Sequence, residues 1–160
     1  MRTDIHGLIL PAALLYAALT MVAGAQSPAA PSGSELEGTS WQLVKIETLD
    51  GKTHVPSDRT RYMVAFAPHG ELSARIDCNR GSGTWVSSEP GSLALGELAS
   101  TRALCPPGSL YDEIVAQWSH VHLFAIRAGH LFLKGDGGIY EYEPVPVSAA
   151  APAPAAAPAH

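Results

Sequence analysis

The sequence predicts an α+β fold that is mostly β: a strongly curved antiparallel sheet or partly open barrel of about seven to eight strands, with one α-helix packed on it. Two observations support this prediction. Apolar and polar residues alternate with period two through much of residues 35–144, which is typical of half-buried antiparallel strands. One segment near residue 110 instead has apolar residues at helical spacing, and many strands must curl around such a helix to hide their edges.

The first half of this region is expected to form short strands. They cover residues 40–47, 62–67, 71–77, 83–88 and 92–98. In the first strand Trp41 and Leu43 point inward, and a change of phase near Val44 and Ile46 indicates a bulge or a strand that is covered on both sides. The turn Pro68–Gly70 is expected to join the second and third strands into a hairpin.

A helix is expected from about Leu110 to Ser119, followed by three more strands. Ser109 can cap the helix, and Asp112 three residues later completes an acidic variant of the capping box. The apolar stripe consists of Leu110, Ile114, Trp118 and Val121. The later strands cover residues 121–126, 130–134 and 138–144, and the segments between them have good turn chemistry.

The N-terminal residues 1–25 have the layout of a secretory signal peptide. Arg2 precedes the apolar run Leu8–Val22, and Ala23–Ala25 supplies the small residues of a cleavage site. The apolar run is shorter than the roughly 20 residues that a membrane-spanning helix needs. Cleavage and export to the periplasm, the cell envelope or the medium are therefore expected, and a retained membrane anchor is the alternative.

The remaining segments flank one expected domain at residues 35–144. Residues 26–34 are predicted to be a flexible lead-in, and the Ala- and Pro-rich residues 145–160 a disordered tail. The formal net charge is −5, and the lysines and arginines are scattered. Nucleic-acid binding is disfavoured because neutralising phosphates requires clustered cations. A monomer without a stable membrane span after signal cleavage is expected.

Cys78 and Cys105 are the only cysteines of the chain. In an exported protein an even number of cysteines is typical of disulfides. A metal site would need paired cysteines or histidines at ligand spacing, and a nucleophilic cysteine would need a nearby histidine. The two residues are therefore predicted to form a disulfide.

Three histidines form the other candidate cluster. His120 and His122 lie on one face if their segment is a strand, and His130 follows across a predicted hairpin. Three imidazoles can bind Zn²⁺ or Cu²⁺, but no carboxylate lies at an obvious ligand spacing, and half-exposed histidines on a sheet are the more common case. Because no catalytic pattern is present either, neither a metal, nor a cofactor, nor a catalytic residue is predicted.

Four stretches of the sequence resemble the META domain, or HslJ-like, family. They are LEGTSWQL at residues 36–43, CNRGSGTW at 78–85, LASTRALCP at 98–106 and LFLKGDGGIYEYEP at 131–144. The resemblance implies a curved antiparallel sheet with a helix. It also implies a mostly bacterial protein, often exported or envelope-attached and linked in general terms to stress, motility or virulence, without assigned catalytic residues or cofactors.

The chain departs from the family pattern at Asp77. Family members commonly have glycine directly before the Cys-Asn pair, and glycine there would allow a special backbone angle. Aspartate is among the more tolerant replacements. The change leaves the expected fold in place but questions any detail of that turn carried over from the family.

The stretch Ile76–Trp85 is interpreted mainly as scaffold. Asn79 suits a turn, Gly81 and Gly83 would let the chain reverse tightly, and the disulfide would tie the end of the hairpin to the entrance of the helix. Asn79 and Arg80 are also candidates for facing a partner.

These patterns favour a non-enzymatic exported envelope protein that acts as a binding or stress-related module. Its expected partner is an envelope protein or a small apolar ligand. The alternatives are a small secreted enzyme of hydrolase type and a hydrolase inhibitor, each with a site formed only in three dimensions. An enzyme would require a concave site with converging polar or titratable groups.

Overall fold

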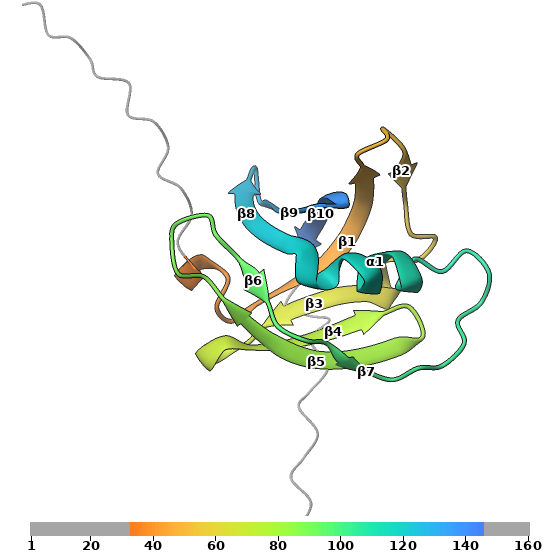
Figure 1. Cartoon of the computed structure of the whole chain (residues 1–160), viewed down its shortest axis with the longest axis horizontal. Helices are drawn as coiled ribbons and strands as arrows, with labels where there is room; N and C mark the ends of the chain where they lie inside the picture. Colours follow the sequence, from red (N-terminus) through yellow and green to blue (C-terminus); the bar gives the residue numbers. More distant parts are fainter. Residues whose placement is uncertain (1–32, 146–160) are drawn as a thin grey trace, which may run out of the picture.

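The structure is a computed structural model that describes residues 33–145 (Figure 1). Its strands are β1 (Thr39–Thr48), β2 (Thr53–His54), β3 (Tyr62–Phe66), β4 (Glu71–Ile76), β5 (Asn79–Val86), β6 (Ala94–Leu95), β7 (Ala99–Ser100), β8 (Val121–Arg127), β9 (His130–Gly135) and β10 (Gly138–Pro144). The helix α1 (Tyr111–Gln117) continues into the 3₁₀ turn η4 (Trp118–His120). The predicted signal peptide, most of the lead-in and nearly all of the tail lie outside the described residues.

The strands form one antiparallel sheet in the order β6-β5-β4-β3-β1-β10-β9-β8, with β2 paired to β1 and β7 to β5. The two ends of this order meet through backbone hydrogen bonds. The Leu93 amide donates to the His122 carbonyl at 3.1 Å, and the Phe124 amide donates to the Gly91 carbonyl at 2.9 Å. The sheet is therefore a nearly closed barrel, which confirms the predicted fold class.

Strand β1 contains the predicted bulge. Its register with β10 shifts between Leu43 and Lys45. Because of this shift, both Leu43 and Ile46 are fully buried although they are three residues apart, while Val44 between them is half-buried. The phase change in the sequence is thus the mark of the bulge.

The hairpin of β3 and β4 around Pro68–Gly70 is confirmed, but the interpretation of the next segment is wrong. Ile76 pairs with Asn79, so Asp77 and Cys78 make the reversal and β5 begins at Asn79. Gly81 and Gly83 are strand residues, not turn residues.

The chain that follows β6 packs closely on these two glycines. A Cβ at Gly81 would lie 2.8 Å from Leu98 Cδ1, and a Cβ at Gly83 would lie 2.8 Å from the Glu97 carbonyl oxygen. Both distances are shorter than real contacts allow. The two glycines are therefore needed for the close approach of residues 97–98 and not for a reversal of the chain.

The predicted helix is present but its cap differs. The N-cap position is Leu110, which provides no side-chain bond, while the Ser109 hydroxyl accepts the Tyr111 amide at 3.2 Å. Of the predicted stripe, Ile114 and Trp118 are buried, as is Val121 at the start of β8, and Leu110 packs partly against the core. Among the described residues, no helix has the length and apolar content to cross a membrane.

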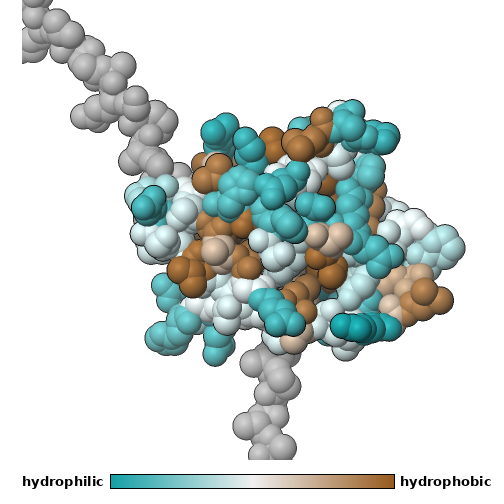
Figure 2. Space-filling model, in the orientation of Figure 1, coloured by the Kyte–Doolittle hydropathy of each residue, from teal (hydrophilic) through white to brown (hydrophobic). Residues whose placement is uncertain are grey.

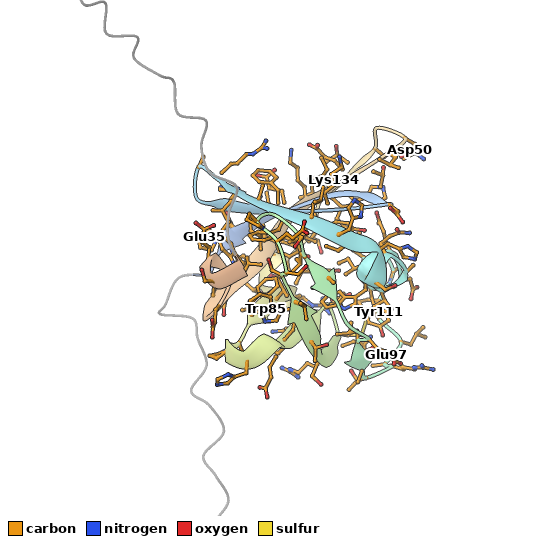
Figure 3. All side chains as sticks on the ribbon, turned by 60° about the vertical axis from the view of Figure 1, so that its left-hand side comes forward. Glu35, Asp50, Trp85, Glu97, Tyr111 and Lys134 are labelled. Atoms are coloured by element: carbon orange, nitrogen blue, oxygen red, sulfur yellow. A yellow bond between two sulfur atoms is a disulfide. The ribbon has the colours of Figure 1, made fainter. Side chains whose placement is uncertain are left out.

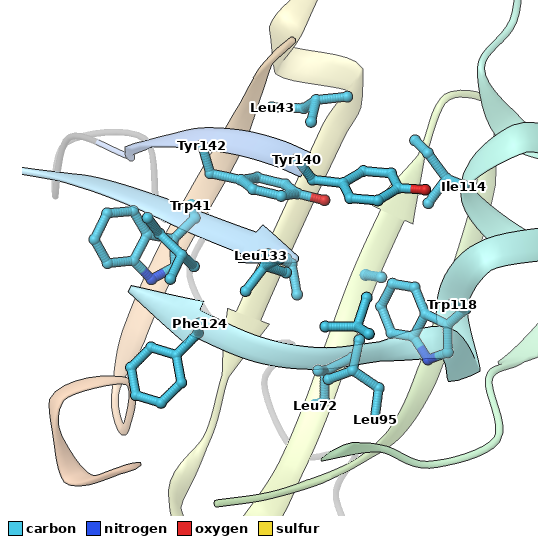
Figure 4. Packing of buried hydrophobic residues seen from close by; sticks show 14 of the residues in the cluster. Trp41, Leu43, Leu72, Leu95, Ile114, Trp118, Phe124, Leu133, Tyr140 and Tyr142 are labelled. Carbon is cyan, nitrogen blue, oxygen red and sulfur yellow. The ribbon is translucent and has the colours of Figure 1, made fainter. Parts of the chain in front are cut away.

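The core lies between α1 and the inner face of the sheet (Figure 4). Trp118 packs beside Leu95, and its indole nitrogen donates to the Gly96 carbonyl at 3.1 Å. The Tyr140 hydroxyl points toward Ile114, and among the described residues it is the one buried side-chain polar atom without a hydrogen-bond partner. The turn η4 thus holds the segment between β6 and β7 against the core.

Candidate functional site

Asn79 holds the loop between β7 and α1, residues 101–110, which we call the stapled loop. The Asn79 side chain is 1% exposed. Its Oδ1 accepts the Ala103 amide at 2.7 Å and the Thr101 hydroxyl at 2.9 Å, and its Nδ2 donates to the Ala103 carbonyl at 3.0 Å. One side chain thus satisfies both backbone groups of Ala103, as a neighbouring strand would.

The predicted disulfide between Cys78 and Cys105 is present, with 5.5 Å between the two Cα atoms. It joins the β4–β5 turn to the stapled loop six residues before Tyr111, the first residue of α1, which confirms that it ties the hairpin end to the entrance of the helix. The Asn79 Nδ2 also lies 3.3 Å from the Cys105 Sγ. The loop is therefore fixed at two nearby points, one covalent and one hydrogen-bonded.

Asp77 shapes the turn that carries Cys78. Its φ is 56°, in the left-handed region that favours glycine. The buried Asp77 carboxylate lies 2.5 Å from the Arg61 guanidinium, and the Asp77 amide donates to the Arg61 carbonyl at 2.7 Å. The special backbone angle implied by the family pattern is thus kept by an aspartate, and two contacts with one arginine offset its cost.

Leu104 lies between the two fixed points and is 100% exposed, the highest value among the exposed large apolar residues that the structure describes. Figure 2 shows an apolar knob at the edge of the molecule where the stapled loop protrudes in Figure 1. The neighbouring residues Ala103 and Cys105 are held from inside, so Leu104 is directed away from the barrel.

Two hollows flank the stapled loop and β7. The first, of about 640 Å³, lies between the loop and α1, and the second, of about 660 Å³, lies on the β5 side of β7. Leu98, Ser100 and Arg102 line both hollows, whereas Tyr111 lines the first and Glu97 the second; Figure 3 labels the latter two side chains. Strand β7 is therefore a narrow ridge between two open surfaces.

Only one of the two candidate partner residues lies at the surface. The Arg80 side chain is exposed and lines the second hollow. The Asn79 side chain is buried and bonded to the stapled loop, so its place in the structure corrects the idea that it faces a partner. A partner role for Arg80 stays a prediction.

The three histidines do not gather. The Nδ1 of His120 lies 3.2 Å from Asp136, and that of His122 lies 3.8 Å from the same carboxylate. His130 pairs with Arg127 at the other end of the β8–β9 hairpin, and its Nδ1 lies 2.8 Å from Glu141. Within residues 33–145 no group of three or more metal-ligating side chains is placed to hold an ion.

The sequence interpretation missed Arg102 and Leu104. The available signal was a leucine in the segment ALCPPG, which has no alternation and two consecutive prolines and is therefore a loop. An apolar residue directly beside a cysteine in such a loop is held in place without being buried. A leucine beside a cysteine in such a loop could therefore have indicated a candidate binding surface in this segment.

The fold and the stapled loop define the class: a small, mostly β domain whose nearly closed sheet is covered by one helix. The META domain family model matches residues 34–144, and the chain belongs to the META domain family.

The fold is similar to that of three solved structures. An NMR structure of a protein from Burkholderia xenovorans has a TM-score of 0.63 at 19% identity, over 82% of this chain and 99% of that chain. Another NMR structure has a TM-score of 0.52 at 25% identity, over 69% of this chain and 92% of that chain. A crystal structure of a DUF4847 family protein from Bacteroides vulgatus has a TM-score of 0.50 at 12% identity, over 68% of this chain and 93% of that chain. No curated protein matches the chain.

Proposed function

We propose that this chain is an exported, non-enzymatic binding protein of the cell envelope, and that its stapled loop presents Leu104 to a protein partner. The observation behind the proposal is the full exposure of Leu104 between two residues that are fixed to the barrel. A layout typical of a signal peptide at residues 1–25 and a disulfide, which persists in oxidising compartments, support export.

A rigid loop is suited to binding because its conformational entropy is already lost when the protein folds. Association then costs less than it would for a flexible loop. Burial of one leucine side chain in a partner contributes about 1.5–3 kcal/mol. Leu104 is thus an anchor for a partner that has an apolar depression.

The dimensions of the hollows and voids favour a protein partner over a small apolar ligand. The void between α1 and the barrel, lined by Trp118 and Tyr140 among others, has a volume of about 10 Å³, whereas pockets for small molecules typically measure about 300–1,000 Å³. The two larger hollows fall within this range of volume, but they are open surfaces, and the first is lined by the protruding Leu104. A hydrolase inhibitor is the special case in which the partner is an enzyme and the loop enters its cleft.

Site-specific photo-crosslinking tests this proposal in the organism that makes the protein. A photoreactive amino acid is placed at position 104 and, as a matched control, at position 86. Val86 is also an exposed apolar residue, 60% exposed, but it lies at the opposite end of β5 from Asn79.

The expected result is an adduct with one envelope polypeptide from position 104 and not from position 86. Leu104→Asp should lower the yield of that complex at least tenfold, as expected for loss of an apolar anchor. Equal adducts from both positions, or none from 104, would refute the binding role. A chain found uncleaved in the cytoplasm would refute export.

A further inference from the structure

Strand β7 has one edge that the barrel does not use. It pairs with β5 through Ser82↔Ala99 and Gly81↔Ser100, and beyond the strand the Thr101 amide donates to the Arg80 carbonyl at 2.9 Å. The hydrogen bonds of an antiparallel strand alternate in direction along the chain. Because the Thr101 amide points toward β5, the backbone amide and carbonyl of Ser100 point away from it.

Among the described strands β7 pairs with β5 alone, so the sheet does not use these two outward-pointing backbone groups of Ser100. The Ser100 hydroxyl is paired with the Tyr111 hydroxyl at 2.8 Å, so the position of Ser100 is fixed while its main chain stays available. Unpaired edge groups are a template for another strand, and natural proteins usually cover them.

The hollow of about 640 Å³ runs beside this free edge. It is bounded by Leu98 on β7's side and by Tyr111 and Val115 of α1 on the other. An added strand lies about 4.8 Å from its neighbour. The hollow therefore provides both the space for an extended chain and an apolar wall for one of its side chains.

The charged side chains beside β7 indicate which charge the partner segment should carry. Arg102 lines both hollows and Arg80 lines the second. In residues 33–145 neither guanidinium takes part in an ion pair, although the chain as a whole has a net charge of −5. Asp112 lines the first hollow and Glu97 the second. A carboxylate is the group that Arg102 binds best, in a bidentate manner.

We propose that an extended segment of the partner protein adds as a strand to the Ser100 edge of β7. One apolar side chain of the segment enters the space between Leu98 and Val115, and an acidic side chain pairs with Arg102. Main-chain hydrogen bonds to Ser100 provide affinity and the two side-chain positions provide specificity, as in other cases of strand addition. This inference rests on the proposed function and names its partner class, a peptide segment of alternating apolar and acidic residues.

Two substitutions at one position separate strand addition from other binding modes. Ser100→Ala and Ser100→Pro both remove the hydroxyl that pairs with Tyr111, but only proline also removes the amide donor. The fold does not use this amide, and an edge strand tolerates proline. Both variants should therefore fold, with similar midpoints of thermal unfolding.

The probe is a set of 12-residue peptides selected from a random displayed library on the full chain. Peptides with alternating apolar and acidic residues are expected. Their affinity for Ser100→Ala should stay within about threefold of the wild type, while Ser100→Pro should weaken it about tenfold through the lost hydrogen bond. Arg102→Glu should weaken it by at least a similar factor. In the wild-type complex, hydrogen exchange of the Ser100 amide should slow, which keeps the test valid if Ser100→Pro does not fold.

Equal affinity for Ser100→Pro and Ser100→Ala would overturn strand addition, and so would a selection that yields no peptide protecting the Ser100 amide. A cross-linked partner at position 104 alongside either result would leave the proposed function standing and refute this mode alone. Absence of both the adduct and the peptide would refute the two together.

Discussion

The Arg61 guanidinium holds the buried Asp77 carboxylate at 2.5 Å, and Asp77 in turn sets the φ of 56° that reverses the chain before Cys78. Arg61 belongs to a 3₁₀ turn before β3, and about one third of its side chain is exposed. The pair thus connects the start of one strand to the turn that carries the disulfide. We therefore expect this ion pair to help hold the stapled loop in position.

Substitutions of Asp77 should separate the ion pair from the backbone angle. Asp77→Ala loses the pair and keeps the unfavourable φ, and we expect it to lower the free energy of unfolding by about 3 kcal/mol. Asp77→Gly loses the same pair but adopts the angle freely, so it should be about 1 kcal/mol more stable than the alanine variant. Urea denaturation of the oxidised proteins measures both values. Equal stabilities would show that the angle carries no cost here.

Removal of the disulfide should destabilise the domain substantially. The bond closes a loop with a sequence separation of 27. In the chain-entropy model, the Cys78→Ala/Cys105→Ala variant should lose about 3.5 kcal/mol of unfolding free energy. Chemical denaturation of this variant and of the reduced wild type should give similar losses. A loss below about 1 kcal/mol would contradict the prediction and point to residual structure in the unfolded chain.

Asn79→Ala should loosen the stapled loop even with the disulfide intact. The substitution leaves the Ala103 amide and carbonyl without their partner, and unsatisfied groups of this kind cost roughly 1–3 kcal/mol each if they stay buried. We expect a loss of about 2 kcal/mol in stability and faster cleavage by trypsin after Arg102. The matched control is Arg80→Ala, whose exposed side chain makes no bond to the loop. Unchanged cleavage in Asn79→Ala would mean that the disulfide alone orders the loop.

Alanine at Gly83 should cost more than alanine at Gly81. The new Cβ at Gly83 would meet the backbone carbonyl oxygen of Glu97 at 2.8 Å. At Gly81 its nearest contact would be the Leu98 Cδ1 at 2.8 Å, which can rotate away, and the Ser100 Cβ would lie at 3.1 Å. Overpacking of this kind typically costs about 1–3 kcal/mol, so we expect Gly83→Ala at the upper end and Gly81→Ala at the lower. Thermal unfolding of the two variants measures the order. The reverse order would show that residues 97–98 yield as a unit.

Tyr140 should make the domain less stable at high pH. Burial raises the pKa of its hydroxyl to about 12 from an ordinary value of 10.0, with a smaller contribution from the charge of Glu113. Between these values the unfolded chain releases the phenolic proton and the folded chain keeps it, so the free energy of unfolding falls as pH rises.

Denaturant titrations from pH 9 to pH 12 measure this slope. The Tyr140→Phe variant should show a smaller fall in the free energy of unfolding over this pH range, because it lacks the hydroxyl that titrates. At pH 7 the same variant should be at least as stable as the wild type, because the hydroxyl it removes is buried without a partner. A marked loss at pH 7 would show that the hydroxyl is hydrogen-bonded in solution.

The alternation of apolar residues was enough to predict most strands, the bulge of β1 and the helix. It failed at the start of β5, because Asn79, Gly81 and Gly83 supply no apolar side chains and resemble a turn. The residues there are in a strand because the partner β4 and the chain at residues 97–100 cover them. Gly81 and Gly83 are required by a close contact with residues 97–98, which the neighbouring sequence does not reveal.

Of the candidate site, only the disulfide between Cys78 and Cys105 could be predicted from the sequence. Two cysteines in a chain that is predicted to be exported indicate a disulfide, and the order of elements places it between hairpin and helix. The bonds between Asn79 and Ala103 join residues that no periodicity relates, so they emerge only from the folded structure. The exposure of Leu104 follows from those bonds, so it could not be predicted from the sequence either.

The central place of β1 constrains how the chain can fold as it is made. This strand pairs with β3 on one side and with β10 on the other, and Trp41 lies opposite Pro144. A chain that emerges with its N-terminus first must therefore keep one edge of its earliest strand unpaired until its last strand appears. Such high contact order slows folding, and it postpones closure of the barrel until β10 has been made.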